Sequence, residues 1–409
     1  MDTAKSETNQ PTLSIVIPAY NEYPGIIPVL EELKRVTSGL VAAGLYRDVT
    51  IIVVDDGSDD QTAEAVKAQE SVHLIQFEKN AGYGAALKAG FAASTTDHLA
   101  FLDADGTYPS AALPELCGPL CRGNVDIVIG SRLAGAPSQM PLVRLLGNKL
   151  FARLTSWASG KHVTDCASGM RVFKRDVLPR LYPLPDGLDF TPAMSTRAIL
   201  EGLKLEEVPI SYHERVGPSK LSAVTDGFRF LGSILRMTTY YNPLKFFGVI
   251  GFFLLLLGAV YGLQPVFHYL QHQEVPEGYI YRLLAILTFW LSGLQIVALG
   301  ILANFSLGII HRQMTLRSKI SQFFLKKSFY NRLDVIGILM VIIAVVLNRA
   351  NIYEYFTTGS ISGHWSYIVT GAILFLTGVQ IFTVHILIRI LAELKQREGY
   401  IAKDLGNKN

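Results

Sequence analysis

Long apolar stretches in the second half of the chain restrict its fold more than any other feature. Three of them cover residues 244–264, 283–305 and 367–391. An α-helix needs about 20 apolar residues to cross the hydrocarbon core of a bilayer, and each stretch has that length. A fourth stretch, 333–348, is shorter and carries Asp334 at its edge, so it requires local thinning of the bilayer or snorkelling side chains. The sequence therefore predicts an all-α membrane domain of about four helices.

Basic residues are distributed unequally among the segments that connect these stretches. The segment 306–332 contains six Lys and Arg residues and the tail after residue 391 contains four, whereas 264–282 and 348–366 contain one each. Because basic loops stay on the cytoplasmic side, this bias predicts a cytoplasmic N-terminal domain, 306–332 segment and C-terminus. An even number of spans returns the chain to the side on which it started, so four spans agree with an N-terminus and a C-terminus that are both cytoplasmic.

Composition separates the first part of the chain from the membrane part. The chain has 409 residues, more than a single hydrophobic core of about 250 to 300 residues accommodates. Residues 1–240 hold 23 Lys and Arg against 27 Asp and Glu, whereas 241–409 hold 14 against 7. An acidic first part without a run of basic residues argues against a nucleic-acid partner, because phosphate binding requires clustered positive charge.

Apolar strand-like runs alternate with helical patterns in the first part of the chain. This alternation is typical of an α/β domain with a mostly parallel sheet covered on both faces. Ligands of such sheets bind beyond the carboxyl ends of the strands, so the residues that follow each run are candidate site residues. The strand-like runs are 13–18, 49–54, 73–77, 98–102 and 125–130, and the helical segments between them include 25–44, 60–70 and 81–94.

Two carboxylates follow the fourth of these runs. Asp103 and Asp105 are separated by one residue, and an extended backbone points both side chains the same way. Two adjacent carboxylates repel each other unless a cation lies between them. Oxygen ligands with few protein donors suit Mg²⁺ or Mn²⁺ bridging a substrate diphosphate. A turn with two Asp residues as turn formers is the structural alternative.

Acids and glycines follow two other runs. Asp55 or Asp56 can accept hydrogen bonds from a base or a ribose, while Ser58 or Asp59 can cap the next helix. Gly82 and Gly84 precede a helical segment, but the Lys-Ser/Thr ending of a P-loop is missing, which argues against an ATPase.

Seven motifs occur in order along this part of the chain: PAYNE, VVDDGS, KNAGYGAAL, DADGTYP, GSR, DCASGMRVFKRD and ERVGPSKLS. As an ordered set over about residues 14–240, they resemble family-2 glycosyltransferases of the polyprenyl-phosphate type, such as dolichyl-phosphate mannose synthases and undecaprenyl-phosphate glycosyltransferases. The resemblance implies a Rossmann-like GT-A fold, a nucleotide-diphosphate sugar donor of the GDP-mannose or UDP-glucose class, Mg²⁺ or Mn²⁺, and a polyprenyl phosphate acceptor.

The same resemblance implies roles for individual positions. Asp103 and Asp105 become contacts to the metal and the diphosphate. Many relatives have a metal-contacting Gln where this chain has Thr107, so metal ligation by Thr107 stays open. The remaining implied contacts are to the nucleoside by Pro18, Tyr20, Glu22 and Asp56, with Asp55 as a further candidate, to the acceptor phosphate by Arg132, Arg144 and Asn148, and to the donor diphosphate by Arg215 and Lys220.

Elementary chemistry favours arginines over a carboxylate base at such a site. A lipid phosphate has its second ionisation near pH 6, about as for other phosphoryl groups, so the nucleophile is already anionic. The protein then needs groups that position the phosphate and offset repulsion between two phosphorylated substrates, for which Arg132 and Arg144 are suited. Asp165 remains an alternative base or acceptor-orienting group.

The sequence predicts inverting hexose transfer at the cytoplasmic membrane face. One alternative is a processive polysaccharide synthase, but such enzymes carry a Gln-x-x-Arg-Trp motif and no Trp of this chain follows an Arg. The other alternative is a non-enzymatic membrane scaffold with a degenerate head. Homo-oligomerisation is left open. The predicted organisation is a cytoplasmic tail over 1–12, a GT-A domain over 13–218, an amphipathic interface helix region over 219–243, a transmembrane domain over 244–393 and a cytoplasmic tail over 394–409.

Overall fold

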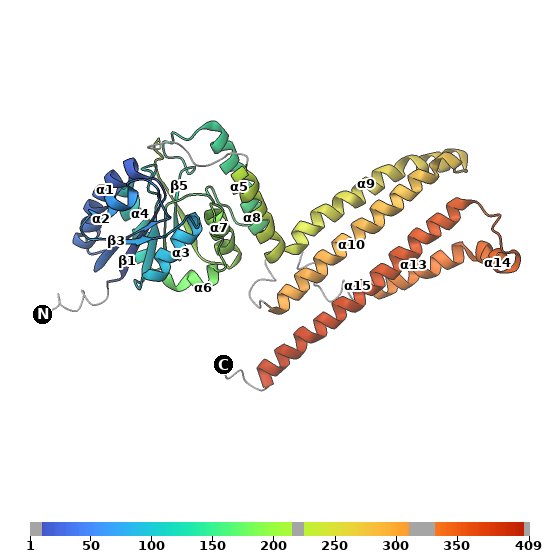
Figure 1. Cartoon of the computed structure of the whole chain (residues 1–409). Coiled ribbons are helices and arrows are strands. Elements are labelled where there is room, and N and C mark those ends of the chain that lie inside the picture. Colours follow the sequence, from blue (N-terminus) through green and yellow to red (C-terminus); the bar gives the residue numbers. More distant parts are fainter. Residues whose placement is uncertain (1–9, 215–224, 311–331, 405–409) are drawn as a thin grey trace. The chain divides into compact units, whose positions relative to one another are not determined.

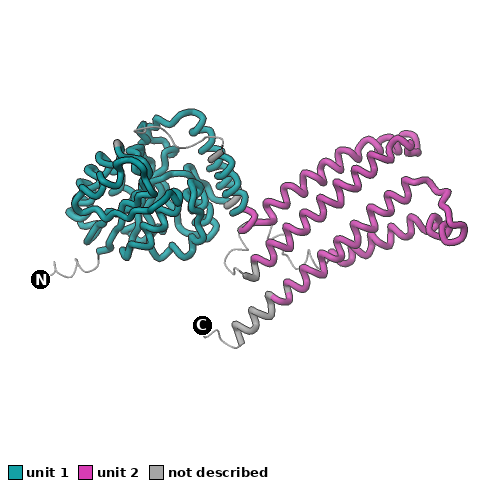
Figure 2. Tube along the Cα trace, viewed as in Figure 1, with its two compact units in different colours: residues 1–237 teal, residues 238–409 magenta. Residues whose placement is uncertain are grey.

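The structure is a computed structural model that describes residues 10–214, 225–310 and 332–404 (Figure 1). The chain divides into two compact units, residues 1–237 and 238–409 (Figure 2). The predicted site residues Arg215 and Lys220 lie outside the described residues, as does most of the basic segment 306–332.

A seven-stranded sheet forms the centre of the first unit, in the order β3-β2-β1-β4-β6-β5-β7. Strand β6 runs antiparallel to both of its neighbours, and all other pairs are parallel. The strands are β1 Thr12–Ala19, β2 Asp48–Asp55, β3 Val72–Gln76, β4 His98–Phe101, β5 Ile127–Ser131, β6 Arg171–Lys174 and β7 Leu205–Pro209.

Helices cover both faces of this sheet. Alternate residues of the strands point to opposite faces, so Ile15 and Ile17 pack toward α1 and α4, whereas Val16 packs toward α3 and α7. The contact with α3 is close, because a Cβ on Gly90 would lie 2.3 Å from Val16 Cγ1. The helices of this unit are α1 Tyr23–Ala42, α2 Thr62–Lys67, α3 Tyr83–Ala93, α4 Leu113–Cys121, α5 Leu142–Ser159, α6 Leu178–Leu181, α7 Phe190–Leu200 and most of α8 Thr225–Tyr241.

All five predicted strand runs are strands, and β6 and β7 are two strands that the sequence pattern did not predict. Every residue of β4 and β5 is buried, which is typical of strands covered on both faces. In α8, Ile234 and Thr238 are buried, whereas Phe228 is 72% exposed. The amphipathic interface region over 219–243 stays a prediction, and within its described part Phe228 lies on the exposed face of α8.

The second unit consists of long apolar helices. Three of them, α9 Pro243–His272, α10 Ile280–Ile310 and α15 Trp365–Asp404, are long and apolar enough to cross a membrane, and they contain the three long predicted spans. The fourth predicted span is a bent pair, α13 Leu333–Leu347 and α14 Arg349–Thr358, with 54° between the two helices. Counted as one span, this pair makes the four crossings that the sequence predicts.

Small residues bring these helices together in two places. A Cβ on Gly251 of α9 would lie 2.8 Å from the carbonyl oxygen of Gly293 of α10. A Cβ on Gly337 of α13 would lie 2.8 Å from the carbonyl oxygen of Gly378 of α15. Such backbone approach at glycines is typical of helix packing in membranes. Helix α15 also continues to Asp404, well beyond the end of the predicted span at residue 391.

Candidate active site

A cavity of about 510 Å³ lies in the first unit where the parallel strands β1, β2, β4 and β5 end. Asp55 and Asp165 do not line it. Ten of the site residues predicted from the sequence do line it, namely Pro18, Tyr20, Glu22, Asp56, Asp103, Asp105, Thr107, Arg132, Arg144 and Asn148.

The two acids after β4 are held by hydroxyl groups. The Tyr83 hydroxyl donates a hydrogen bond to Asp103 Oδ1 over 2.8 Å. The backbone amide and hydroxyl of Thr107 donate to Asp105 Oδ1 over 3.1 and 2.6 Å, and Thr107 is only 1% exposed. Thr107 thus orients the Asp105 carboxylate, a contact that the sequence analysis did not predict, and metal ligation by Thr107 itself stays open.

A glycine completes the surroundings of Asp103. A Cβ on Gly169 would lie 2.3 Å from Asp103 Oδ2, so any larger residue would displace this carboxylate. The Gly169 amide also donates to the Tyr108 hydroxyl over 2.7 Å. Because Gly169 is far from Asp103 in sequence, its motif, CASGMR, gave no indication of this contact.

The acid pair fits a divalent cation that is shared with a substrate. Among the described residues, no group of three or more His, Cys, Asp or Glu side chains could hold a metal ion. Mg²⁺ is usually held by one or two carboxylates together with substrate phosphates and water. Asp103 and Asp105 match this pattern, whereas a site made by protein ligands alone does not fit the described residues.

Asp55 and Asp56 have different roles. Asp56 lines the cavity and accepts hydrogen bonds from the amides of Ala81 and Gly82, at 2.7 and 3.0 Å. Burial raises the pKa of the Asp56 carboxyl group, although these hydrogen bonds act in the opposite direction. Asp55 is fully buried and accepts hydrogen bonds from the amide and hydroxyl of Ser58. Asp55 therefore forms the turn, while Asp56 faces the cavity.

The start of α3 does not present its amides to a ligand. The Gly84 and Ala85 amides donate to the carbonyl oxygen of Asp186 over 2.7 and 3.1 Å. Gly82 has a φ of 106°, and a Cβ there would lie 2.5 Å from that same oxygen. The protein itself occupies these donors, in agreement with the exclusion of a P-loop.

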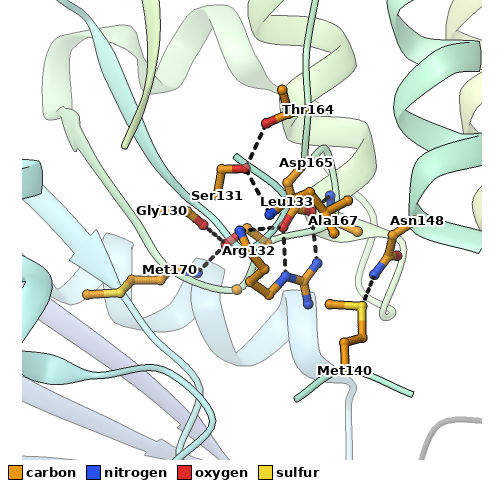
Figure 3. A network of polar contacts seen from close by, with 12 residues as sticks. Gly130, Ser131, Arg132, Leu133, Met140, Asn148, Thr164, Asp165, Ala167 and Met170 are labelled. Atoms are coloured by element: carbon orange, nitrogen blue, oxygen red, sulfur yellow. Dashed lines mark hydrogen bonds and ion pairs between the residues drawn. The ribbon is translucent and has the colours of Figure 1, made fainter. Parts of the chain in front are cut away.

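Arg132 and Asp165 form a buried ion pair at the end of β5 (Figure 3). The guanidinium group donates two hydrogen bonds to the carboxylate, from Nε to Oδ2 over 2.7 Å and from Nη2 to Oδ1 over 2.8 Å. The guanidinium also lies over the rings of Tyr108 and Tyr212, 5.8 and 5.5 Å from their centroids. Asp165 is fully buried, whereas Arg132 reaches the cavity.

Each charge of this ion pair shifts the pKa of the other group. Burial lowers the pKa of Arg132, but the charge of Asp165 raises it, and the net pKa lies well above its ordinary value. Burial raises the pKa of Asp165, but the charge and hydrogen bonds of Arg132 lower it to below its ordinary value. Both groups are therefore charged at neutral pH. This geometry makes Asp165 a residue that positions Arg132 and does not favour it as a base.

A second buried arginine holds the loop behind the acid pair. Arg171 is fully buried, and it donates from Nε to the carbonyl of Ser168 and from Nη2 to the carbonyls of Cys166 and Thr191, over 2.9 to 3.1 Å. Burial lowers the pKa of Arg171 to about 10. The loop that carries Asp165 and Gly169 thus has a fixed path.

Helices α5 and α8 also line the cavity. Arg144 and Asn148 are one turn apart on α5, and Arg229 of α8 also lines the cavity. The two helices meet through an edge-to-face pair of Phe151 and Phe230, with 5.6 Å between ring centroids. Sequence reasoning assigned Arg229 only to an amphipathic helix, because no motif marks it as a site residue.

An apolar row runs along α5 beside the residues that line the cavity. Leu142, Leu146 and Leu150 follow one another at one-turn spacing and are 74%, 67% and 55% exposed. An exposed apolar row of this kind is typical of surfaces that contact a membrane or another apolar partner.

Two family models match this chain, one in each unit. Residues 14–181 match glycosyl transferase family 2, and residues 243–402 match a domain of unknown function, DUF8752. A low-salt glycan biosynthesis hexosyltransferase, Agl6, of Haloferax volcanii is 34% identical over 61% of this chain, which spans only 58% of that protein.

Two further relatives are covered almost completely. A dolichyl-phosphate hexose transferase of Haloferax volcanii is 32% identical over 55% of this chain and 93% of its own length. An undecaprenyl-phosphate 4-deoxy-4-formamido-L-arabinose transferase of Klebsiella pneumoniae is 30% identical over 75% of this chain and 91% of its own length. Among solved structures, glucosyl-3-phosphoglycerate synthase from Mycobacterium tuberculosis has a TM-score of 0.46 and 23% identity, covering 57% of this chain and 82% of that one.

Proposed function

The chain belongs to glycosyl transferase family 2, and on this basis we propose that it transfers a hexose from a nucleotide-diphosphate sugar to a polyprenyl phosphate. It is a membrane glycosyltransferase with a GT-A-like, mostly parallel sheet. The relatives named for dolichyl-phosphate and undecaprenyl-phosphate transfer support this acceptor class. The observation that carries the proposal is a single cavity that joins the Asp103 and Asp105 pair to Arg132 and Arg144.

The acidic end of the cavity suits the sugar donor. Pro18, Tyr20 and Asp56 line the part next to the acids and would surround the nucleoside, whose GDP or UDP identity depends on contacts at this end. Asp103 and Asp105 would hold Mg²⁺ or Mn²⁺, which when bound offsets the charge that develops on the leaving diphosphate. Tyr83 and Thr107 keep both carboxylates oriented for this role.

The basic end suits the acceptor phosphate. A phosphate oxygen that is already anionic attacks the anomeric carbon from the face opposite the leaving diphosphate, so the transfer inverts the configuration. Arg132, fixed by Asp165 and two tyrosine rings, would position this phosphate together with Arg144 and Asn148. No carboxylate base is required because the attacking phosphate oxygen is already anionic, and the Asp165 carboxylate binds Arg132.

Exposed apolar surface and the distribution of basic residues indicate where the reaction takes place relative to the membrane. The exposed row of Leu142, Leu146 and Leu150 lies beside the residues that line the cavity. An acceptor with a long apolar tail requires apolar surface of this kind next to the site that binds its phosphate. The basic segment 306–332 and the basic C-terminal tail support a cytoplasmic catalytic unit. We therefore place the transfer at the cytoplasmic membrane face, with the catalytic domain at 13–218 and the interface region at 219–243.

Arg144→Ala tests the acceptor end of this assignment. We expect the KM for the polyprenyl phosphate to rise by about tenfold or more, with the KM for the donor nearly unchanged, because a charge-assisted hydrogen bond to phosphate is lost. Initial rates measured with either substrate varied separately distinguish the two constants. Arg153→Ala is the matched control, since Arg153 lies on the same helix, is exposed and does not line the cavity. An equal rise in both KM values would contradict the assignment.

A further inference from the structure

A second cavity lies within the membrane unit, between α13 and α15. Its volume is about 620 Å³. Four ionisable residues line it, Asp334 from the first turn of α13 and His385, Arg389 and Glu393 from α15. Ionisable side chains are rare in membrane helices, and where they occur they mark a functional site by default.

The cavity has a polar side and an apolar side that run in parallel along α15. His385, Arg389 and Glu393 follow one another at one-turn spacing and form the polar row. An apolar row with the same spacing lies next to it, and Ile338 of α13 continues this apolar surface one turn from Asp334. The apolar row consists of Phe382, Ile386, Ile390 and Leu394. A polar row beside an apolar row matches a lipid, whose headgroup and acyl chain need adjacent surfaces of these two kinds.

The polar row begins inside the hydrocarbon core at His385 and reaches the depth of lipid headgroups at Arg389. The apolar part of α15 that could cross the membrane is Trp365–Leu391, which has Gly378 at its midpoint. Arg389 lies about 16 Å along the helix from this midpoint, at about half the 30 Å thickness of the hydrocarbon core. His385 is about 10 Å from the midpoint by the same rise, and it is only 5% exposed. Asp334, in the first turn of α13, lies at this same end of the pair, because His385 Nε2 is 3.9 Å from Asp334 Oδ2.

The charges of the residues that line the cavity favour one class of lipid headgroup. Asp334 and Glu393 contribute two negative charges, whereas Arg389 contributes one permanent positive charge and His385 one only when it is protonated. A headgroup that carries only negative charge could pair with Arg389 but would offer no cation to the carboxylates of Asp334 and Glu393. The cavity complements a zwitterion, with the phosphate near Arg389 and the amine near a carboxylate that lines the same cavity.

We propose that the cavity between α13 and α15 binds a membrane phospholipid whose headgroup carries both a phosphate and a primary ammonium group. The site is separate from the cavity of the catalytic unit, and its residues belong to the segment that matches the domain of unknown function. A bound lipid of this kind links the first turn of α13 to the last apolar turns of α15.

Native mass spectrometry of the purified full chain tests this proposal, with phosphatidylethanolamine and phosphatidylglycerol as probes. We expect one retained phosphatidylethanolamine and about tenfold weaker retention of phosphatidylglycerol, which has no amine to meet the carboxylates. Arg389→Ala should weaken phosphatidylethanolamine binding by about tenfold, since the charge-assisted contact to the phosphate is lost. Equal retention of the two lipids by the unmodified chain would overturn the proposal.

Two further variants make the test independent of misfolding. Arg349→Ala is the matched control, because Arg349 lies in the same unit on α14 and does not line the cavity, and it should bind both lipids as the unmodified chain does. Glu393→Gln keeps the shape of the side chain and removes its charge, so it should reduce the preference for phosphatidylethanolamine over phosphatidylglycerol. An unchanged preference in Glu393→Gln, or binding by Arg389→Ala equal to that of Arg349→Ala, would refute the site.

Discussion

Replacing Asp105 by Asn should lower kcat/KM for sugar transfer by about a hundredfold to a thousandfold, as expected when a group that stabilises the charge of the leaving diphosphate is lost. The substitution keeps an oxygen that can accept the hydrogen bonds from Thr107 but removes the negative charge needed to hold the cation. The variant should therefore fold normally. Initial rates with a radiolabelled nucleotide sugar and a short polyprenyl phosphate measure the effect.

Asp48→Asn is the matched control for this experiment. Asp48 is exposed and lies at the first residue of β2, at the opposite end of the strand from the cavity. It should transfer sugar at the rate of the unmodified chain. Turnover by Asp105→Asn above about one tenth of that rate would show that Asp105 does not hold an essential cation, since loss of one such group costs about a hundredfold or more.

Arg132→Met should destabilise the first unit by about 3–5 kcal/mol, because it leaves the Asp165 carboxylate buried without its partner. Asp165 is fully buried, and the guanidinium of Arg132 makes two hydrogen bonds to it. Hydrogen exchange of peptides that span β5 and the Asp165 loop, measured on the full chain, gives the local free energy of opening. Combining Arg132→Met with Asp165→Asn should restore most of the lost protection, because no uncompensated charge remains, but should not restore transfer.

The direction of the Asp165 pKa shift determines the pH at which this hydrogen-exchange measurement should be made. Because Arg132 lowers the pKa of Asp165, the ion pair stabilises the folded chain fully above the ordinary carboxyl pKa of about 3.9 and loses this effect as the pH falls through the lower folded value. At pH 7 the pair is fully charged. Protection in the double variant as low as in Arg132→Met alone would contradict the buried-charge explanation.

The parallel part of the sheet could be predicted because its strands are buried on both faces and appear as short apolar runs. Strands β6 and β7 could not be predicted in this way. β6 has four residues and lies antiparallel between β4 and β5, so only long-range pairing identifies it. β7 contains Glu206 and Glu207, and its charged pattern resembles a surface segment.

The candidate site, too, could be predicted only in part from the sequence. Asp103 and Asp105 directly follow a buried strand, and their place at the ligand edge follows from the parallel sheet alone. The partnership of Arg132 with Asp165 joins residues of different loops, and no periodic pattern marks it. The sequence also could not distinguish Asp55 from Asp56, because their different roles depend on which way a single turn directs each side chain.

The central claim is that this chain attaches one sugar to a lipid phosphate. The most direct test is thin-layer analysis of the lipids after the full chain is incubated with Mg²⁺ or Mn²⁺, a polyprenyl phosphate and each of several radiolabelled GDP- and UDP-hexoses. The proposal predicts one labelled lipid that carries a single sugar, formed from one donor and only when the lipid phosphate is present. No labelled lipid with any donor, or a high-mass glycan made without the lipid phosphate, would contradict it.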